Sequence, residues 1–139
     1  MKDLIFDEFQ NSVDSCLLRH KSILDILSKL QESQSRVNRS VVKAVTSCGC
    51  VKINAEKQGI NYSLNDESLD DLNLDDLDIP LNSHLEGCIC EGCRKIIERE
   101  IGNNLFYVTS LCNSLDLNLY DILLTEYKNI KTFNKLNLR

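Results

Sequence analysis

The sequence predicts an all-α protein, a single bundle of about four helices. The chain has 139 residues, a length that suits one domain, so we expect residues 1–139 to fold as one helical unit. It contains five glycines and only one proline, whereas sheet-rich folds need frequent turns that favour these two residues. Apolar residues also recur at steps of three and four, which is the period of one face of a helix.

Two amphipathic helices are expected in the first third of the chain. The first runs from about Asp3 to Cys16 or Leu18, with these apolar residues on one face: Leu4, Ile5, Phe9, Val13, Cys16 and Leu17. The second is expected to begin after Ser22 and to end at Gly49. Its apolar positions alternate steps of four and three, which is typical of a helix packed in a bundle. They are Ile23, Leu27, Leu30, Gln34, Val37, Val41, Ala44 and Cys48, with Gln34 as the one polar member.

Residues 51–87 are expected to form an acidic loop region that separates two groups of cysteines. Within this region, residues 64–81 carry seven acidic side chains and no basic one. Clustered like charges favour an extended, solvated chain over a carboxylate metal site. We therefore expect residues 64–79 to be mobile, because their charges repel one another and they can bury little apolar surface.

Two more helices are expected after the acidic region. The third begins near Cys90 to Cys93 and runs to about Leu115, with this apolar line at helical spacing: Ile97, Ile101, Leu105, Val108, Cys112 and Leu115. Asn118 and Asp121 resemble a capping pair at the start of the last helix. That helix carries Leu119, Ile122, Leu123, Tyr127 and Ile130.

The overall charge and hydropathy exclude several classes of partner. A net charge of −5 gives no electrostatic support for binding a nucleic acid polymer. The first residues lack the long uncharged run of a signal peptide, and no apolar segment approaches the roughly 18 residues of a membrane span. We therefore expect a cytoplasmic protein with no membrane partner, in which cysteines stay reduced.

Five of the seven cysteines fall into two tight groups, Cys48 with Cys50 and Cys88 with Cys90 and Cys93. Sulfur ligands of one metal ion must converge, and zinc binds thiolates at about 2.3 Å. Cys90 and Cys93 are the best-spaced pair, and Cys48 and Cys50 are the natural second pair. Cys88 is a spare or alternative ligand. In an antiparallel helix pair the two groups meet at one end, so we expect a metal site there.

Zinc is the expected metal, because four thiolates in a tetrahedral shell are a common structural zinc site. Five clustered cysteines also permit an iron–sulfur cluster, and a redox role for the thiols stays open. His84 is a more distant candidate ligand. Cys16 and Cys112 lie on apolar stripes and are expected to serve in packing.

Part of the sequence resembles the MazG-like nucleotide pyrophosphohydrolases. The run Glu100-Ile101-Gly102-Asn103-Asn104-Leu105-Phe106-Tyr107 resembles the third helix of that family, which reads Glu-Leu-Gly-Asp-Leu-Leu-Phe-Tyr. Residues 115–119 look like its turn into the last helix, and residues 27–44 are similar to its first acidic helix. The resemblance implies a helical bundle that binds Mg²⁺ through two acidic motifs, Glu-Glu-x-x-Glu and Glu-x-x-Asp, and that forms dimers or tetramers.

The acidic motifs of that family are only partly present. The first would read Glu32-Ser33-Gln34-Ser35-Arg36, and in the second Asn103 replaces the acid three residues after Glu100. Mg²⁺ prefers oxygen ligands, mainly carboxylates, and thiolates are too soft to replace them. Glu32, Glu100 and Asn103 are therefore the candidate catalytic positions of a degraded site, and Mg²⁺ is expected only if the protein is an enzyme. Arg36 is a candidate phosphate contact.

We expect a non-catalytic, zinc-containing helical protein that senses a nucleotide or mediates assembly. One alternative is an active Mg²⁺-dependent nucleoside triphosphate pyrophosphohydrolase, and a second is a thiol-based redox or metal sensor. The alternating apolar pattern of residues 23–48, together with the habit of the family that the chain resembles, indicates a homo-oligomer.

Overall fold

The structure, a computed structural model, describes residues 2–58 and 81–133. These residues form four α-helices, which are α1 (Lys2–Cys16), α2 (Ile23–Lys43), α3 (Glu91–Ser114) and α4 (Leu119–Phe133). A π-helical turn, η1 (Ala44–Cys48), continues α2, and two short strands, β1 (Val51–Ile53) and β2 (Leu85–Gly87), pair antiparallel. The mostly helical fold with four helices is confirmed, and the small sheet was not expected. The acidic segment predicted to be mobile, residues 64–79, lies outside the described residues.

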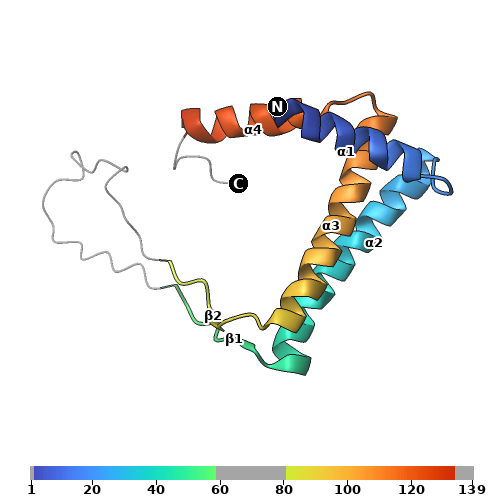
Figure 1. Ribbon diagram of the computed structural model, residues 1–139. Helices are drawn as coiled ribbons and strands as arrows, with labels where there is room; N and C mark the ends of the chain where they lie inside the picture. Colours follow the sequence, from blue (N-terminus) through green and yellow to red (C-terminus); the bar gives the residue numbers. More distant parts are fainter. Residues whose placement is uncertain (1, 59–80, 134–139) are drawn as a thin grey trace, which may run out of the picture.

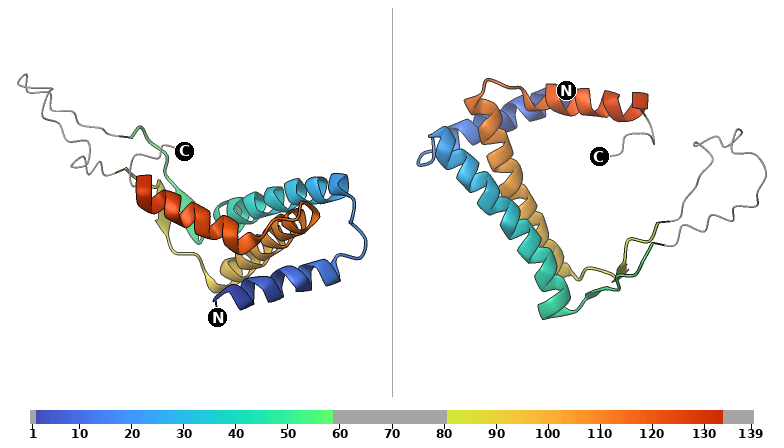
Figure 2. Two further views of the ribbon diagram at one scale, coloured as in Figure 1. Left: turned by 90° about the horizontal axis from the view of Figure 1, so that it is seen from above. Right: turned by 180° about the vertical axis from the view of Figure 1, so that it is seen from behind.

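The helices form a long hairpin with a crossing layer at one end. α2 and α3 run antiparallel, side by side, over most of their lengths (Figure 1). The two strands extend from one end of this hairpin, whereas α1 and α4 cross its other end (Figure 2). In the described part of the chain, no helix is long and apolar enough to cross a membrane.

The face of α2 that packs against α3 differs from the apolar stripe that the sequence predicts. The buried residues of α2 and η1 follow their own helical spacing: Ile26, Ser33, Ser40 and Ala44. Ile23, Leu27 and Val41 of the predicted stripe are instead 38%, 47% and 39% exposed. The predicted stripe is therefore wrong for Ile23, Leu27 and Val41, whereas Ala44 of that stripe is buried as expected. Small residues, two of them serines, hold most of the contact positions.

Serine side chains suit this helix contact because their polar groups are satisfied locally. The Ser33 hydroxyl donates to the carbonyl of Leu30 at 2.7 Å, and the Asn104 side chain of α3 donates to the Ser33 oxygen at 3.0 Å. The Ser40 hydroxyl donates to the carbonyl of Val37, also at 2.7 Å. The distance between packed helices depends on the side chains at their contact, so small residues favour a close approach.

A buried amide network fixes α1 to the turn between α3 and α4. The Gln10 side chain donates to Asn113 Oδ1 at 2.9 Å and to the carbonyl of Leu117 at 3.0 Å, and its oxygen accepts from the backbone of Leu119 at 2.8 Å. Asn118 caps α4 by accepting from the backbone N–H of Asp121 at 3.0 Å, as expected from the sequence. Both the nitrogen and the oxygen of the Gln10 side-chain amide therefore have hydrogen-bond partners. A buried polar group that is hydrogen-bonded in this way avoids most of the free-energy cost of losing its contact with water.

Replacing Ser33 by leucine should destabilise the hairpin, since Ser33 is 1% exposed against α3. Added volume at a packed position typically costs about 1–3 kcal/mol. The matched control is Ser35→Leu, two residues away on the exposed side of α2, which should change the free energy of unfolding by less than about 0.5 kcal/mol. Urea denaturation of both variants measures this difference. Equal destabilisation by the two changes would contradict the packing described for α2.

Candidate metal centre

The end of α2 is shaped so that two cysteines flank one tight turn. The π-helical turn η1 widens the last turn of the helix and ends at Cys48. Gly49 then adopts a left-handed conformation, with φ of 73°, and its N–H donates to the carbonyl of Ala44 at 2.9 Å. Glycine adopts this backbone conformation without steric cost. The chain therefore reverses between Cys48 and Cys50, and both side chains stay near the helix end.

The other two cysteines open α3. Cys90 is the N-cap residue of this helix, and its sulfur accepts from the backbone N–H of Cys93 at 3.4 Å. One helical turn separates the two residues, so their sulfurs lie on the same side of the helix start. Cys90 thus takes the capping position that a serine or aspartate oxygen usually occupies.

The two-stranded sheet brings the two cysteine pairs together. Val51 of β1 pairs with Gly87 of β2, which places the segment after Cys48 beside the segment before Cys90. A Cβ atom added to Gly87 would lie 2.8 Å from the carbonyl oxygen of Cys50, and the φ angle of Gly87 is 89°. Both the close approach and the backbone conformation require glycine at this position.

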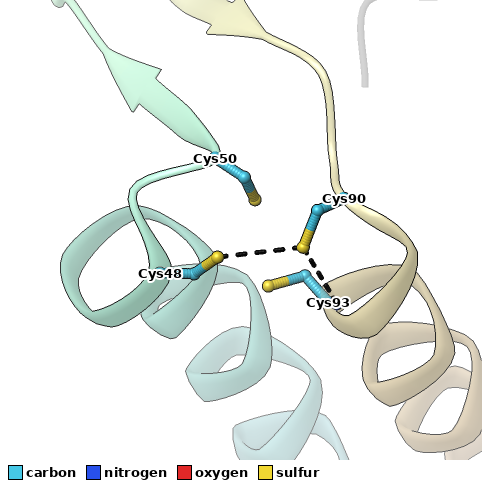
Figure 3. Close-up of side chains that lie close together, drawn as sticks. All are labelled: Cys48, Cys50, Cys90 and Cys93. Carbon is cyan, nitrogen blue, oxygen red and sulfur yellow. Dashed lines mark hydrogen bonds between the residues drawn. The ribbon is translucent and has the colours of Figure 1, made fainter.

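The four thiols form one compact cluster. The sulfur atoms of Cys48, Cys50, Cys90 and Cys93 all lie within 4.8 Å of one another, and they point toward a common centre (Figure 3). The sulfurs of Cys48 and Cys90 are 3.8 Å apart, and all the cysteines are free thiols. Four sulfurs on a tetrahedral zinc ion, at about 2.3 Å from the metal, would lie roughly 3.8 Å from one another. The cluster is therefore able to bind a metal ion.

The thiols perturb one another's titration. The pKa of Cys90 is lowered to about 7, chiefly because the backbone N–H of Cys93 donates to its sulfur. The pKa of Cys93 is raised to about 12, chiefly by its hydrogen bond with Cys90. Bringing thiols this close thus favours one thiolate and disfavours the next. A divalent cation removes this conflict, because it replaces the protons and stabilises several thiolates at once.

The cluster lies on a small apolar core. Ala44, Val51 and Ile97 are buried together beneath it, and Cys50 and Cys93 are partly buried against them. Cys48 and Cys90 are exposed on the outer side. All four donor atoms are thiol sulfurs, which is typical of a closed structural site rather than of a catalytic site with an open position.

The remaining sulfur and imidazole candidates lie outside this cluster. Cys88 is exposed and is not one of the four converging residues, although only one residue separates it from Cys90. His84 is not part of the cluster either, and its Nε2 atom is buried without a hydrogen-bond partner among the described residues. Cys112 is buried, as its place on an apolar stripe suggests, but Cys16 is exposed.

The acidic candidates each have a cationic partner. Glu32 pairs with Lys29 at 2.9 Å on the exposed side of α2. The side chain of Glu100 is only 8% exposed, and it accepts from Arg36 Nε at 2.9 Å and from Arg36 Nη2 at 3.3 Å. Arg99 approaches the same carboxylate at 3.5 Å. The hydrogen bond from Arg36 lowers the pKa of Glu100, so this carboxyl stays ionised at neutral pH.

The sequence interpretation missed two features near these sites. One is the sheet, for which the alternation Val51-Lys52-Ile53 is a weak signal over only three residues. The other is a basic row on α2, Arg36, Arg39 and Lys43, whose steps of three and four indicate one helix face.

The Arg36–Glu100 pair should make stability depend on pH. A carboxyl whose pKa is lower in the folded state stabilises the fold above its unfolded pKa of about 4.3, and this contribution is lost as pH falls through the folded value. Between pH 7 and pH 3, the melting temperature of the wild type should therefore fall further than that of Glu100→Gln.

The matched control is Glu98→Gln, at an exposed position on the same helix without an ion pair among the described residues. Its melting temperature should follow the wild-type pH profile. The same pH dependence in the wild type and in Glu100→Gln would show that the ion pair does not contribute to acid sensitivity.

Comparison of the chain with protein-family models, with curated proteins and with solved structures found no match in any of the three.

Proposed function

We propose that the protein is a non-catalytic helical assembly module whose hairpin is closed by a structural zinc ion. The observation that carries this proposal is the convergence of four sulfur atoms within 4.8 Å. Zinc is preferred because it favours tetrahedral thiolate sites and needs no further ligand there. An iron–sulfur cluster is the alternative occupant of four thiolates.

The four cysteines come in two pairs, one from each helix of the hairpin. Cys48 and Cys50 come from the end of α2, and Cys90 and Cys93 come from the start of α3. A shared ion would link two segments about forty residues apart in the chain, and the Cys48–Cys90 contact spans 42 residues. Closing a long loop lowers the entropy of the unfolded chain, so metal binding adds directly to folding stability.

Replacing Cys90 and Cys93 together with serine should remove the metal. We expect about one zinc ion per wild-type chain, measured by elemental analysis after purification without a metal-affinity tag. The double variant should contain none and should melt at a lower temperature, because it loses the cross-link between α2 and α3.

Cys88→Ser is the matched control, since Cys88 adjoins the cluster but does not converge with it. It should keep both the metal and the melting temperature. A metal-free wild-type protein, or a Cys88→Ser variant that loses zinc, would contradict the proposed ligand set, and a stoichiometric iron and sulfide content would favour the cluster alternative.

The assembly role is supported by apolar surface that the hairpin leaves uncovered. A groove of about 570 Å³ lies between α1, α3 and α4 and is lined almost entirely by apolar side chains: Ile5, Phe6, Phe9, Leu105, Leu119, Ile122, Leu123 and Glu126. Exposed apolar patches of this kind mark interaction sites. The exposed part of the α2 stripe has the four-and-three spacing of helices that pair with other helices. A second copy of the chain is therefore the proposed partner, in line with the oligomers of the family that the sequence resembles.

Replacing Leu123 in this groove by aspartate should weaken self-association. Leu123 is 50% exposed, and a charge there would have to be buried in an apolar interface. The matched control is Leu85→Asp in β2, where the leucine is 48% exposed and far from the groove in the chain. Light scattering coupled to gel filtration should show an oligomer for the wild type and Leu85→Asp, and a monomer for Leu123→Asp. A wild-type protein that is monomeric even at high concentration would contradict the proposed assembly role.

The enzyme alternative depends on carboxylates that are already paired. Hydrolysis of a nucleoside triphosphate would need Mg²⁺ held by oxygen ligands near the attacking water. Glu32 and Glu100 each face a cation instead, and Asn103 supplies an amide where the resemblance calls for an acid. Mg²⁺-dependent release of pyrophosphate by the wild type that disappears in Glu100→Gln would overturn the non-catalytic proposal.

The redox alternative is favoured by one observation, the lowered pKa of Cys90 beside the Cys48 sulfur. A thiolate near neutral pH is the reactive form of cysteine. Reversible formation of a Cys48–Cys90 disulfide in protein that carries no metal would support this alternative over a permanent zinc site.

A further inference from the structure

A second groove runs between α2 and α3 and differs in character from the apolar one. It has a volume of about 400 Å³, and its lining comes from α2 on one wall and from α3 on the other: Arg36, Arg39, Ser40 and Lys43, then Ile96 and Glu100. It shares no lining residue with the apolar groove. The two grooves therefore offer separate binding surfaces.

Cations dominate this groove although the whole chain has a net charge of −5. Arg36, Arg39 and Lys43 are spaced by three and four residues, which places them on one face of α2. Glu100 is the one acid in the lining, and Arg36 and Arg99 both approach its carboxylate. Its charge is thus already balanced, and the other two cations of the groove are left in excess.

The three cations play different parts. Glu100 holds the Arg36 guanidinium through Nε and Nη2, which orients its remaining N–H groups and keeps the side chain from turning away. Arg39 and Lys43 make no hydrogen bond or ion pair with any residue that the structure describes. An oriented guanidinium beside two uncommitted cations is the arrangement that phosphate oxygens require, because arginine binds them through several directed N–H groups.

The groove also has an apolar wall. Ile96 of α3 lines it and is 45% exposed. The Ser40 hydroxyl, which also lines the groove, donates to the carbonyl of Val37 in its own helix. A ligand here would therefore meet positive charge on α2 and hydrocarbon on α3. The volume lies within the range of small-molecule sites, about 300–1,000 Å³.

We propose that this groove binds a small organic phosphate, with its phosphate group on Arg36, Arg39 and Lys43 and its apolar part against Ile96. Three cations suit one or two phosphate groups. A nucleic acid polymer would instead need a longer basic track and would be repelled by the rest of the acidic chain. The site depends on neither the zinc ion nor self-association.

The test uses inorganic pyrophosphate and adenosine 5′-diphosphate as probes, titrated into the full chain at low salt and followed by calorimetry and by amide chemical shifts. The wild type should bind both probes saturably, with the largest shifts in residues 36–43 and 96–100. Arg39→Gln combined with Lys43→Gln should weaken binding about tenfold or more, because two charged contacts are lost. Adenosine without phosphate should not bind.

A matched control removes the same charges elsewhere. Arg19→Gln combined with Lys21→Gln also removes one arginine and one lysine, at exposed positions in the connection before α2, whose first residue lies about 24 Å along the helix axis from Arg39. This control should bind as the wild type does, within about twofold. Circular dichroism and melting temperature verify that both double variants are folded.

Four outcomes would overturn the proposal. The first is absence of saturable binding by the wild type at probe concentrations up to about 5 mM. The second is an equal loss of affinity in the groove variant and the control, which would show a general charge effect. The third is chemical-shift changes that map to another part of the chain. The fourth is tighter binding of single-stranded RNA than of either probe.

Discussion

The antiparallel contact between α2 and α3 determines where the cysteine cluster and the basic groove lie. Because Ser33 and Ser40 occupy the contact positions, the helices meet through small side chains whose hydroxyls bond to their own helix. The antiparallel arrangement brings the end of α2 and the start of α3 together, and with them the two cysteine pairs. The same contact aligns Arg36 with Glu100 halfway along the hairpin.

The two ends of this hairpin are held by different chemistry. At one end four sulfur atoms converge above a small apolar core. At the other end the Gln10 side chain donates to Asn113 Oδ1, the Asn113 side chain donates to the backbone carbonyl of Gln10, and Gln10 Oε1 accepts from the backbone of Leu119 at the start of α4. A buried amide network specifies geometry only when each of its polar groups has a hydrogen-bond partner. The nitrogen and the oxygen of the Gln10 side chain both have such partners. Specific polar contacts or converging side chains therefore define the geometry at both ends of the hairpin.

Helix positions could be predicted from the sequence far better than helix orientation. The start of α3, its end near Leu115 and the cap at Asn118 all follow from local patterns of apolar and capping residues. The buried face of α2 could not be predicted in this way, since hydrophobic periodicity assigns the core to leucine and isoleucine, whereas the structure places Ser33 and Ser40 there. Cysteine spacing indicated the cluster of four thiols, because cysteines separated by one or two residues can converge without long-range information. Which two pairs meet depends on the hairpin and on the strand register Val51 to Gly87, which short strands do not reveal.

The π-helical turn at the end of α2 links the sulfur cluster to the length of the helix that precedes it. A π turn accommodates about one residue more than an α turn over the same rotation. Loss of one residue from Ala44–Cys48 would restore regular helix and leave Cys48 in nearly the same direction around the axis. Loss of one residue from the regular helix between Ser40 and Ala44 would instead rotate Cys48 by about 100° relative to the face that packs against α3. All four cysteines would remain in such a chain, yet their sulfurs would no longer converge.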